Sequence, residues 1–336
     1  MPLHPTKGDC TASSAMNPML NGRNCLPACP GPRSSASPPT GRAASACSTA
    51  ASTPSSCSTA TGRSSRPGGE GSSSGRTAAH VCDDAVWCAD DNDHTVRKFT
   101  PDGRPQLTLG TSGRPSDTGA TSMDYRNVRR AGPPFHYPTN LAVAPDGNLY
   151  INDGYHENAC VHVFSPDGRH LHSWGEPGAG PGQFHLPHGI AVDRRGTVYV
   201  ADRENSRVQL FNLKGQYLSE WADVARPCQV FVWDDHVYVG GYRFPCRQVA
   251  SNPEPPADAP GGRLSVFDQE GKLLARWGGG RNPCAAGDFF APHGVCVDSR
   301  GDVYVGEVVM SGGGNQGLVP PTCHSLQKFT RREVPN

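Results

Sequence analysis

The fold of this chain can be read from the stretch PHGIAVDRRGTVYVAD (residues 187–202). It predicts two short strands rich in β-branched residues, joined by a polar turn that contains Gly196. Near copies stand at PTNLAVAPDGNLYIND (138–153) and PHGVCVDSRGDVYVGE (292–307), with looser versions at PCQVFVWDDHVYVGG (227–241) and DDAVWCADD (83–91). The hairpin is therefore an internal repeat.

A second hairpin follows each copy of the first. A phenylalanine precedes a turn glycine by four residues, and a large apolar residue follows that glycine by six, as in the set Phe99–Gly103–Leu109, Phe164–Gly168–Trp174, Phe211–Gly215–Trp221 and Phe267–Gly271–Trp277. Two hairpins per unit make a four-stranded sheet. Units that start at Pro138, Pro187, Pro227 and Pro292 are 49, 40 and 65 residues apart, which brackets the length of a propeller blade. The sequence therefore predicts an all-β propeller over residues 81–332, with about five recognisable blades.

Residues 1–80 are different in kind. They contain no aromatic residue, no Val and no Ile, and they are filled with Ser, Pro, Ala, Gly, Arg and Cys. Such a segment buries too little apolar surface to offset the entropy of ordering it, so we expect disorder. Two origins fit this composition: an authentic low-complexity tail, or coding sequence read in a wrong frame upstream of Cys82.

Charge and cysteine usage exclude several classes of protein. The chain has 31 basic and 31 acidic side chains; seven basic and two acidic ones lie in residues 1–80, so residues 81–336 carry a net charge of −5. This argues against a nucleic-acid partner, which needs a clustered basic face. The thirteen cysteines form no paired zinc-knuckle or small-disulfide pattern. With no membrane-length apolar run and no secretory leader, these features predict a soluble cytoplasmic protein.

The repeat resembles the NHL repeat. Three segments, DGYHENACVHVFSPDG, SWGEPGAGPGQFHLPHGIAVD and VYVADRENSRVQLF, are similar in order to peptidyl-α-hydroxyglycine α-amidating lyase, a six-bladed zinc propeller. The resemblance covers about residues 83–330. It implies cleavage of the C–N bond of a peptidyl-α-hydroxyglycine, giving a peptide amide and glyoxylate, with zinc held by three histidines from three blades.

Two histidines fit that zinc site. His188 and His293 each lie eight residues before the turn glycine of their unit, so a propeller would bring both to its central channel. A catalytic zinc takes three protein ligands and keeps one open position. The first unit places Arg76 at the corresponding position, and the nearby His80 is four residues out of register, so His80 is only a doubtful third ligand. The alternative reading is that each Pro-His-Gly is a strand entrance with histidine filling a polar channel.

Two further residues match catalytic positions of that family. Tyr155 takes the place of the general base, and Arg203 takes the place of an arginine near zinc and substrate. A tyrosine is normally protonated at neutral pH, so adjacent positive charge would have to favour its ionised form. Alternatively, Tyr155 only caps a strand and Arg203 pairs with Asp202 or Glu204.

The chain also departs from the resemblance. The disulfide positions of the family carry His136, His156, Tyr199 and Leu210 here, which agrees with a reducing compartment. An acidic residue that helps to bind structural calcium is replaced by Gly294, so calcium is doubtful. Cys228, Cys284 and Cys296 are interpreted as buried small apolar residues rather than nucleophiles. The chain ends seven residues after Phe329, which predicts an incomplete last hairpin.

Two functions follow from these observations. The first is a zinc-dependent lyase that takes a peptide or small-molecule substrate in the central channel, impaired by the missing third histidine. The second is a non-catalytic NHL propeller that binds a protein or peptide on one face. The sequence leaves the oligomeric state open.

Overall fold

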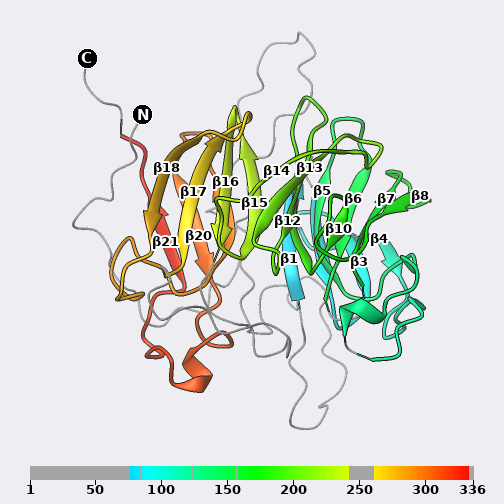
Figure 1. Ribbon diagram of the computed structural model, residues 1–336, viewed down its shortest axis with the longest axis horizontal. Coiled ribbons are helices and arrows are strands. Elements are labelled where there is room, and N and C mark those ends of the chain that lie inside the picture. Colours follow the sequence, from blue (N-terminus) through cyan, green and yellow to red (C-terminus); the bar gives the residue numbers. More distant parts are fainter. Residues whose placement is uncertain (1–75, 83–84, 123, 156–157, 242–260, 333–336) are drawn as a thin grey trace.

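The computed structural model describes residues 76–82, 85–122, 124–155, 158–241 and 261–332. These residues form an all-β structure with two short 3₁₀ helices, Tyr125–Asn127 and Gly314–Gln316 (Figure 1). Four sheets have four strands and a fifth has three, each built by antiparallel neighbours in chain order. Among the described residues, no helix is long and apolar enough to cross a membrane.

The sheets are the blades of a propeller, here called blades A to E in chain order. Blade A consists of β1 Arg76–Cys82, β2 Ala85–Asp90, β3 Thr95–Phe99 and β4 Pro105–Gly110, and blade B of β5 Pro138–Val143, β6 Leu149–Asp153, β7 Cys160–Phe164 and β8 His170–Trp174. Blade C consists of β11 Pro187–Val192, β12 Val198–Asp202, β13 Arg207–Phe211 and β14 Tyr217–Trp221, and blade D of β15 Pro227–Trp233, β16 His236–Gly241, β17 Arg263–Asp268 and β18 Leu273–Gly278. Blade E has three strands, β19 Pro292–Val297, β20 Val303–Glu307 and β21 Leu326–Phe329. A short parallel pair, β9 Glu176–Pro177 and β10 Gln183–Phe184, connects blades B and C.

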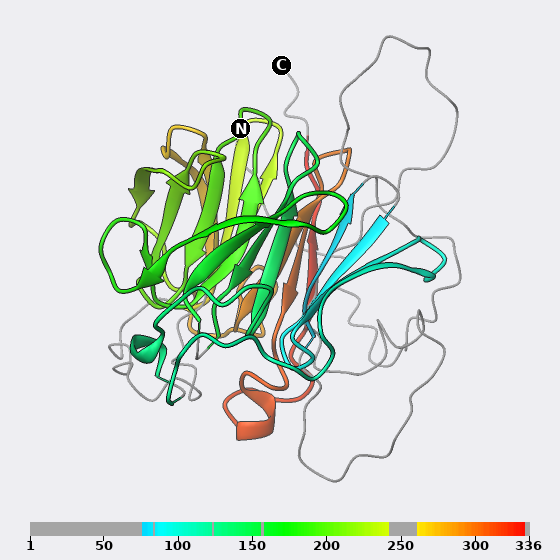
Figure 2. The same ribbon diagram turned by 90° about the vertical axis from the view of Figure 1, so that its right-hand side faces the viewer.

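The first strand of each blade lies innermost. Successive innermost strands contact one another, β1 with β5, β5 with β11, β11 with β15 and β15 with β19, so the blades stand side by side (Figure 2). Apolar clusters fill the space between neighbouring blades; one of them joins Tyr150 and Val161 of blade B to Ile190 and Phe211 of blade C. No comparable contact joins β19 back to β1 within the described part of the chain.

The spacing of the second hairpin has a packing cause. Each turn glycine adopts a left-handed backbone, as with φ of +75° at Gly215 and +88° at Gly271. The large apolar residue of one blade covers the turn glycine of the next: a Cβ on Gly215 would lie 2.5 Å from the Trp174 ring, and one on Gly271 would lie 2.3 Å from the Trp221 ring. The glycine is therefore required both for its backbone conformation and for the close approach of the neighbouring blade.

In blades C and E, an acidic side chain at the end of the second strand binds the loop that precedes the blade. Asp202 accepts a hydrogen bond from the backbone N–H of His185 at 2.8 Å and from Arg207 Nε at 2.8 Å. Glu307 accepts from the backbone N–H of Phe290 at 2.7 Å in the same way. These bonds hold the segments that lead into β11 and β19, and thus the entrances where the two histidines stand.

The start of the fold differs from the sequence expectation. The fold begins at Arg76 rather than residue 81, because β1 pairs with β2 along its length. The expected disorder of the remaining N-terminal segment concerns residues 1–75, which lie outside the described residues, as does His156.

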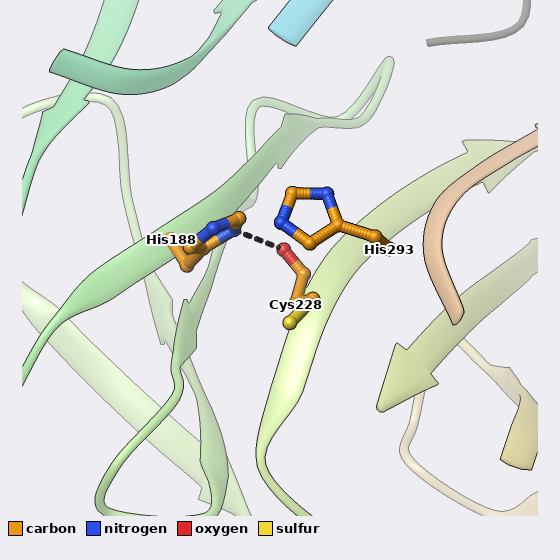
Figure 3. Close-up of side chains that lie close together, drawn as sticks. All are labelled: His188, Cys228 and His293. Carbon is orange, nitrogen blue, oxygen red and sulfur yellow. Dashed lines mark hydrogen bonds between the residues drawn. The ribbon is translucent and has the colours of Figure 1, made fainter. Parts of the chain in front are cut away.

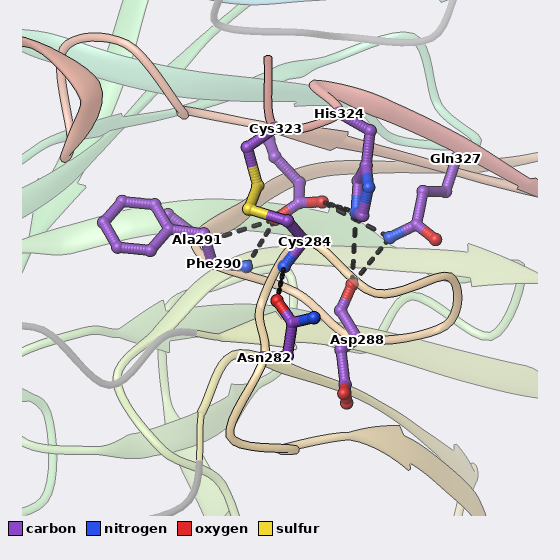
Figure 4. The surroundings of a disulfide bond; sticks show 9 residues. Asn282, Cys284, Asp288, Phe290, Ala291, Cys323, His324 and Gln327 are labelled. Atoms are coloured by element: carbon purple, nitrogen blue, oxygen red, sulfur yellow. Dashed lines mark hydrogen bonds and ion pairs between the residues drawn. A yellow bond between two sulfur atoms is a disulfide. The ribbon is translucent and has the colours of Figure 1, made fainter. Parts of the chain in front are cut away.

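Cys284 is also not a buried, unlinked apolar residue. It is half-buried and forms a disulfide with Cys323 across 39 residues of sequence, which joins the loop after β18 to the segment before β21 (Figure 4). This disulfide could not be predicted from the sequence, because the two cysteines are far apart in the chain and only the folded loops bring their side chains together. Cys228 and Cys296 are buried and form no disulfide, in agreement with the sequence expectation.

Candidate metal centre

The innermost strands of blades C, D and E each carry a residue that can bind a metal, at the equivalent position near the start of the strand. Each strand begins with a proline paired to the end of the second strand, and a register shift follows directly after it. The residues at this shift are His188 on β11, Cys228 on β15 and His293 on β19. Such bulges re-aim a side chain out of the regular alternation of the strand, and they are frequent beside functional sites.

Gly189 explains why histidine is followed by glycine in β11. A Cβ at this position would lie 2.6 Å from the backbone oxygen of Cys228 and 2.7 Å from the Cα of Gln229. The absence of a side chain thus lets β15 approach β11 closely. As a result, His188 Nδ1 lies 2.8 Å from the backbone oxygen of Cys228.

This contact fixes the tautomer of His188. A carbonyl oxygen can only accept, so Nδ1 must carry the proton and donate it, and Nε2 then presents a lone pair. A hydrogen bond of this kind is the usual orienting partner of a metal-ligating histidine.

The three residues lie close together, with the two imidazole rings beside the backbone oxygen of Cys228 (Figure 3). One ligand atom from each of His188, Cys228 and His293 lies within 4.8 Å of the other two, and the rings of the two histidines are 4.6 Å apart. His188 and Cys228 are buried, with 1% and 0% exposure, and His293 is partly exposed. Among the described residues, this is the one group of three or more His, Cys, Asp or Glu side chains close enough to share a metal ion.

Burial keeps both histidines in the form that binds metals. It lowers the pKa of His188 well below the usual range, with His293 and Arg203 adding to the effect. Burial, followed by the charge of Arg203, lowers the pKa of His293 to about 3. Both rings are therefore neutral at neutral pH, as metal coordination requires.

Tyr155 and Arg203 lie at the same point. The Tyr155 hydroxyl is 2.8 Å from His188 Nε2, and because that nitrogen holds a lone pair, the hydroxyl donates. The guanidinium carbon of Arg203 lies 5.6 Å from the centre of the Tyr155 ring. The structure thus brings together His188, His293, Tyr155 and Arg203, which the sequence selected from four separate segments.

The charge of Arg203 is shared in a buried ion-pair network. Arg203 Nε donates to Glu204 Oε1 at 2.8 Å, and Arg226 Nη2 donates to the same oxygen at 2.7 Å. Burial raises the pKa of Glu204, but the charges of Arg203 and Arg226 outweigh it, so the pKa is lowered and the carboxylate is ionised. The pairing of Arg203 with Glu204 that the sequence allowed is present, and it leaves one net positive charge beside the site.

His80 does not join this group. It stands in the middle of β1, opposite Trp87, whereas the register shift of that strand falls between Arg76 and Ala78. Thr77, and not Arg76 as the sequence predicted, is therefore the residue in register with His188. Gly294 follows His293 and pairs with Gly306 on β20, and it offers no side-chain oxygen to a cation.

Sequence reasoning missed Cys228 as a candidate ligand. The signal was present, because Pro-Cys-Gln at 227–229 aligns with Pro-His-Gly at 187–189 and 292–294. It also missed Arg226 and His185. His185 stacks on Tyr125 with ring centres 3.7 Å apart, and that contact depends on the long connection between blades A and B.

Comparison with known proteins supports the repeat assignment. Residues 134–252 match a protein family described as a 6-bladed β-propeller. The chain is 32% identical over 151 residues to human NHL repeat-containing protein 3, which is 43% of this chain and 40% of that protein. It is 28% identical over 244 residues to peptidyl-α-hydroxyglycine α-amidating lyase 1 of Drosophila melanogaster, which is 67% of this chain and 41% of that protein.

A third relative extends this comparison. Mouse peptidyl-glycine α-amidating monooxygenase is 36% identical over 137 residues, which is 38% of this chain and 13% of that protein. The chain is an NHL-repeat β-propeller whose homologues, at modest identity, include NHL repeat-containing protein 3 and peptidyl-α-hydroxyglycine amidating lyase. The match spans about 40% of the length of human NHL repeat-containing protein 3.

Proposed function

We propose that the chain is a zinc-dependent carbon–nitrogen lyase that cleaves a peptidyl-α-hydroxyglycine, or a similar carbinolamide, into an amide and glyoxylate. The observation that carries this proposal is the hydrogen bond from Tyr155 to His188 Nε2 at 2.8 Å, beside His293 and Arg203. The Tyr155 hydroxyl, which we propose as the proton-transfer group, thus lies next to two neutral histidines and a buried cation. The similarity to peptidyl-α-hydroxyglycine α-amidating lyase 1 supports the same reaction.

The residues present fit a zinc ion. His188 carries its proton on Nδ1, which donates to the Cys228 carbonyl, so Nε2 keeps a lone pair that could bind a metal, and His293 adds a second imidazole. When bound, zinc would supply a Lewis acid that polarises the substrate hydroxyl oxygen.

The residues of this chain have separable roles in the reaction. Tyr155, after giving up its own hydroxyl proton to solvent, would take the hydroxyl proton of the substrate as general base. The O–H electrons form the carbonyl of glyoxylate, the C–N electrons go to the amide nitrogen, and that nitrogen receives the proton that Tyr155 took, so no water is consumed. Arg203 favours the ionised form of Tyr155 and attracts the substrate carboxylate.

The test is release of glyoxylate from a synthetic peptidyl-α-hydroxyglycine by the zinc-loaded chain. We expect release that stops after chelation and in His188→Ala. The matched control is His170→Ala, because His170 is an exposed histidine of β8 that lies outside the ligand group. Equal release by wild type and His188→Ala would contradict the proposal.

A second function has its own support. The chain is also 32% identical over 151 residues to human NHL repeat-containing protein 3, whose name states no reaction. If the zinc-loaded chain releases no glyoxylate, a propeller that binds a protein or peptide replaces the lyase. A cytoplasmic location, which the sequence suggests, is a separate proposal that neither function requires.

A further inference from the structure

We propose that Cys228 is the third protein ligand of the metal centre, so that blades C, D and E together hold zinc in a two-histidine, one-thiolate site. This inference rests on the proposed metal role of His188 and His293. It adds a ligand of a different chemical type and removes the need for a histidine from blade A.

The register of the strands supports this assignment. Cys228 directly follows Pro227, which pairs with Gly241 across the register shift of β15. His188 and His293 directly follow Pro187 and Pro292 in the same way. Repetition of the blade therefore directs the three side chains toward one axis, as in any set of equivalent innermost positions.

The distances suit a small tetrahedral ion. Zinc binds nitrogen at about 2.0–2.1 Å and sulfur at about 2.3 Å, so neighbouring ligand atoms of a tetrahedral site are roughly 3.5 Å apart. The three ligand atoms here lie within 4.8 Å of one another. Side-chain rotations would have to bring these atoms closer together, and the three residues stand at equivalent register shifts of three neighbouring strands.

Charge favours a thiolate at this position. Arg203, with 2% exposure, and Arg226 both bind the carboxylate of Glu204, so these three groups together carry one net positive charge beside the site. A divalent cation held by two neutral imidazoles would add two more in a buried place, which is costly. On binding, the Cys228 thiol would lose its proton to solvent, and the thiolate would cancel one of those charges.

The donor set also selects the metal and leaves room for the substrate. Imidazole and thiolate suit zinc, whereas calcium and magnesium prefer oxygen ligands. Three protein ligands leave the fourth position of a tetrahedral zinc open, as in catalytic sites. A site made only from blades C to E would need no ligand from β1.

The direct test uses cobalt(II) as the probe metal. Metal-free protein is titrated with cobalt(II), and the near-ultraviolet charge-transfer absorption of a cobalt–thiolate bond is followed. We expect one equivalent of cobalt per chain with this absorption in wild type. Cys228→Ser should lose the absorption and bind zinc at least ~100-fold more weakly in a competition assay, because loss of even an outer-shell partner costs 10–100-fold.

The matched control is Cys296→Ser, because Cys296 is also a buried cysteine of an innermost strand but lies outside the ligand group. This variant should keep both the absorption and the affinity. If Cys228→Ser fails to fold, X-ray absorption at the zinc edge of the wild-type protein replaces it. We then expect one sulfur at about 2.3 Å.

The outcomes separate this inference from the proposed function. Metal that binds through His188 without a thiolate signal, or without sulfur at the zinc edge, overturns the role of Cys228 and leaves the lyase proposal standing. A thiolate-bound metal in a chain that releases no glyoxylate supports the role of Cys228 and overturns the lyase proposal. Failure to bind either metal overturns both.

Discussion

The hydroxyl of Tyr155 lies 2.8 Å from Nε2 of His188, and the two residues come from neighbouring blades. Tyr155 follows β6 of blade B, and His188 opens β11 of blade C. This relationship depends on the packing of one blade against the next, which Gly154 permits: a Cβ there would lie 2.2 Å from the backbone oxygen of Pro187. The candidate base and the candidate ligand are thus positioned by the same inter-blade contact.

Removal of the Arg203 charge should slow the proposed reaction. In Arg203→Met, the cation 5.6 Å from the Tyr155 ring is lost, so the ionised tyrosine and the substrate carboxylate are less favoured. We expect glyoxylate release to fall by about 10²-fold in kcat/KM. Arg226→Met is the control, because Arg226 binds the same Glu204 oxygen. A rate that falls equally in both variants would assign the effect to the ion-pair network rather than to Arg203.

The turn glycine of blade C should resist substitution more than an isolated glycine does. Gly215 and Gly182 share a φ of +75°, but a Cβ on Gly215 would meet the Trp174 ring at 2.5 Å, whereas no atom outside the chain neighbours lies within 4 Å of a Cβ on Gly182. We expect Gly215→Ala to lower the free energy of unfolding by about 1–3 kcal/mol more than Gly182→Ala does. Equal losses in chemical denaturation would mean that Trp174 does not restrict this turn.

Much of the fold was accessible from the sequence, because the physical causes of the repeat are local. The phenylalanine, the turn glycine and the following tryptophan are fixed by a hairpin and by the adjacent blade, so their spacing recurs. The start of the first blade was missed, since RTAAHVC at 76–82 lacks the strand pattern of its counterparts and becomes β1 through pairing with β2.

The candidate site was only partly accessible. His188 and His293 could be paired because they stand in identical Pro-His-Gly contexts. Cys228 was missed because cysteine stands where the other two blades have histidine, although the alignment of Pro-Cys-Gln with Pro-His-Gly was available, and the shared register shift shows the equivalence. Arg203 and Arg226 both bind Glu204 because two connecting segments approach each other in the fold, and no local sequence pattern predicts this contact.

His185 should make stability depend on pH. Burial lowers its pKa from 6.5 to about 4, so the unfolded chain takes up a proton before the folded chain does as the pH falls. The free energy of unfolding should therefore fall as the pH drops from 6.5 toward 4, and the loss due to His185 is on the order of 3 kcal/mol at pH 4. His185→Phe keeps a ring to stack on Tyr125 but cannot titrate.

The comparison of the two proteins isolates this histidine. Asp202, which binds the backbone of His185, has its pKa raised to about 6 by burial, and it titrates in both proteins. The wild type should therefore lose more stability than His185→Phe between pH 6.5 and pH 4 in denaturant titrations. Parallel curves over this range would rule out His185 as the cause.

The Cys284–Cys323 disulfide should stabilise the end of the propeller. It closes a loop of 39 residues, and a bridge of this span contributes about 2–4 kcal/mol. Cys284→Ser should lose that amount under non-reducing conditions, and it should equal the wild type in the presence of a reductant. A wild type insensitive to reductant would show that the bridge adds nothing.

The same bridge bears on the compartment. A cytoplasmic location predicts that both thiols are reduced in cells, whereas a stable bridge is typical of oxidising compartments. Peptide mapping of protein alkylated at the moment of lysis distinguishes the two: a linked pair of peptides containing Cys284 and Cys323 contradicts a reducing compartment, and two alkylated peptides support it.

The central claim is that Tyr155 acts as the base of a lyase at this site, and glyoxylate release by Tyr155→Phe tests it most directly. The phenyl ring remains beside His188, so metal content and the thermal transition should match the wild type. Release of glyoxylate from a peptidyl-α-hydroxyglycine should fall by about 10²–10⁴-fold, the usual cost of losing a general base. Tyr150→Phe, which removes a hydroxyl bonded to the Leu213 carbonyl at 2.9 Å, should keep the wild-type rate. Equal release by wild type and Tyr155→Phe would contradict the account.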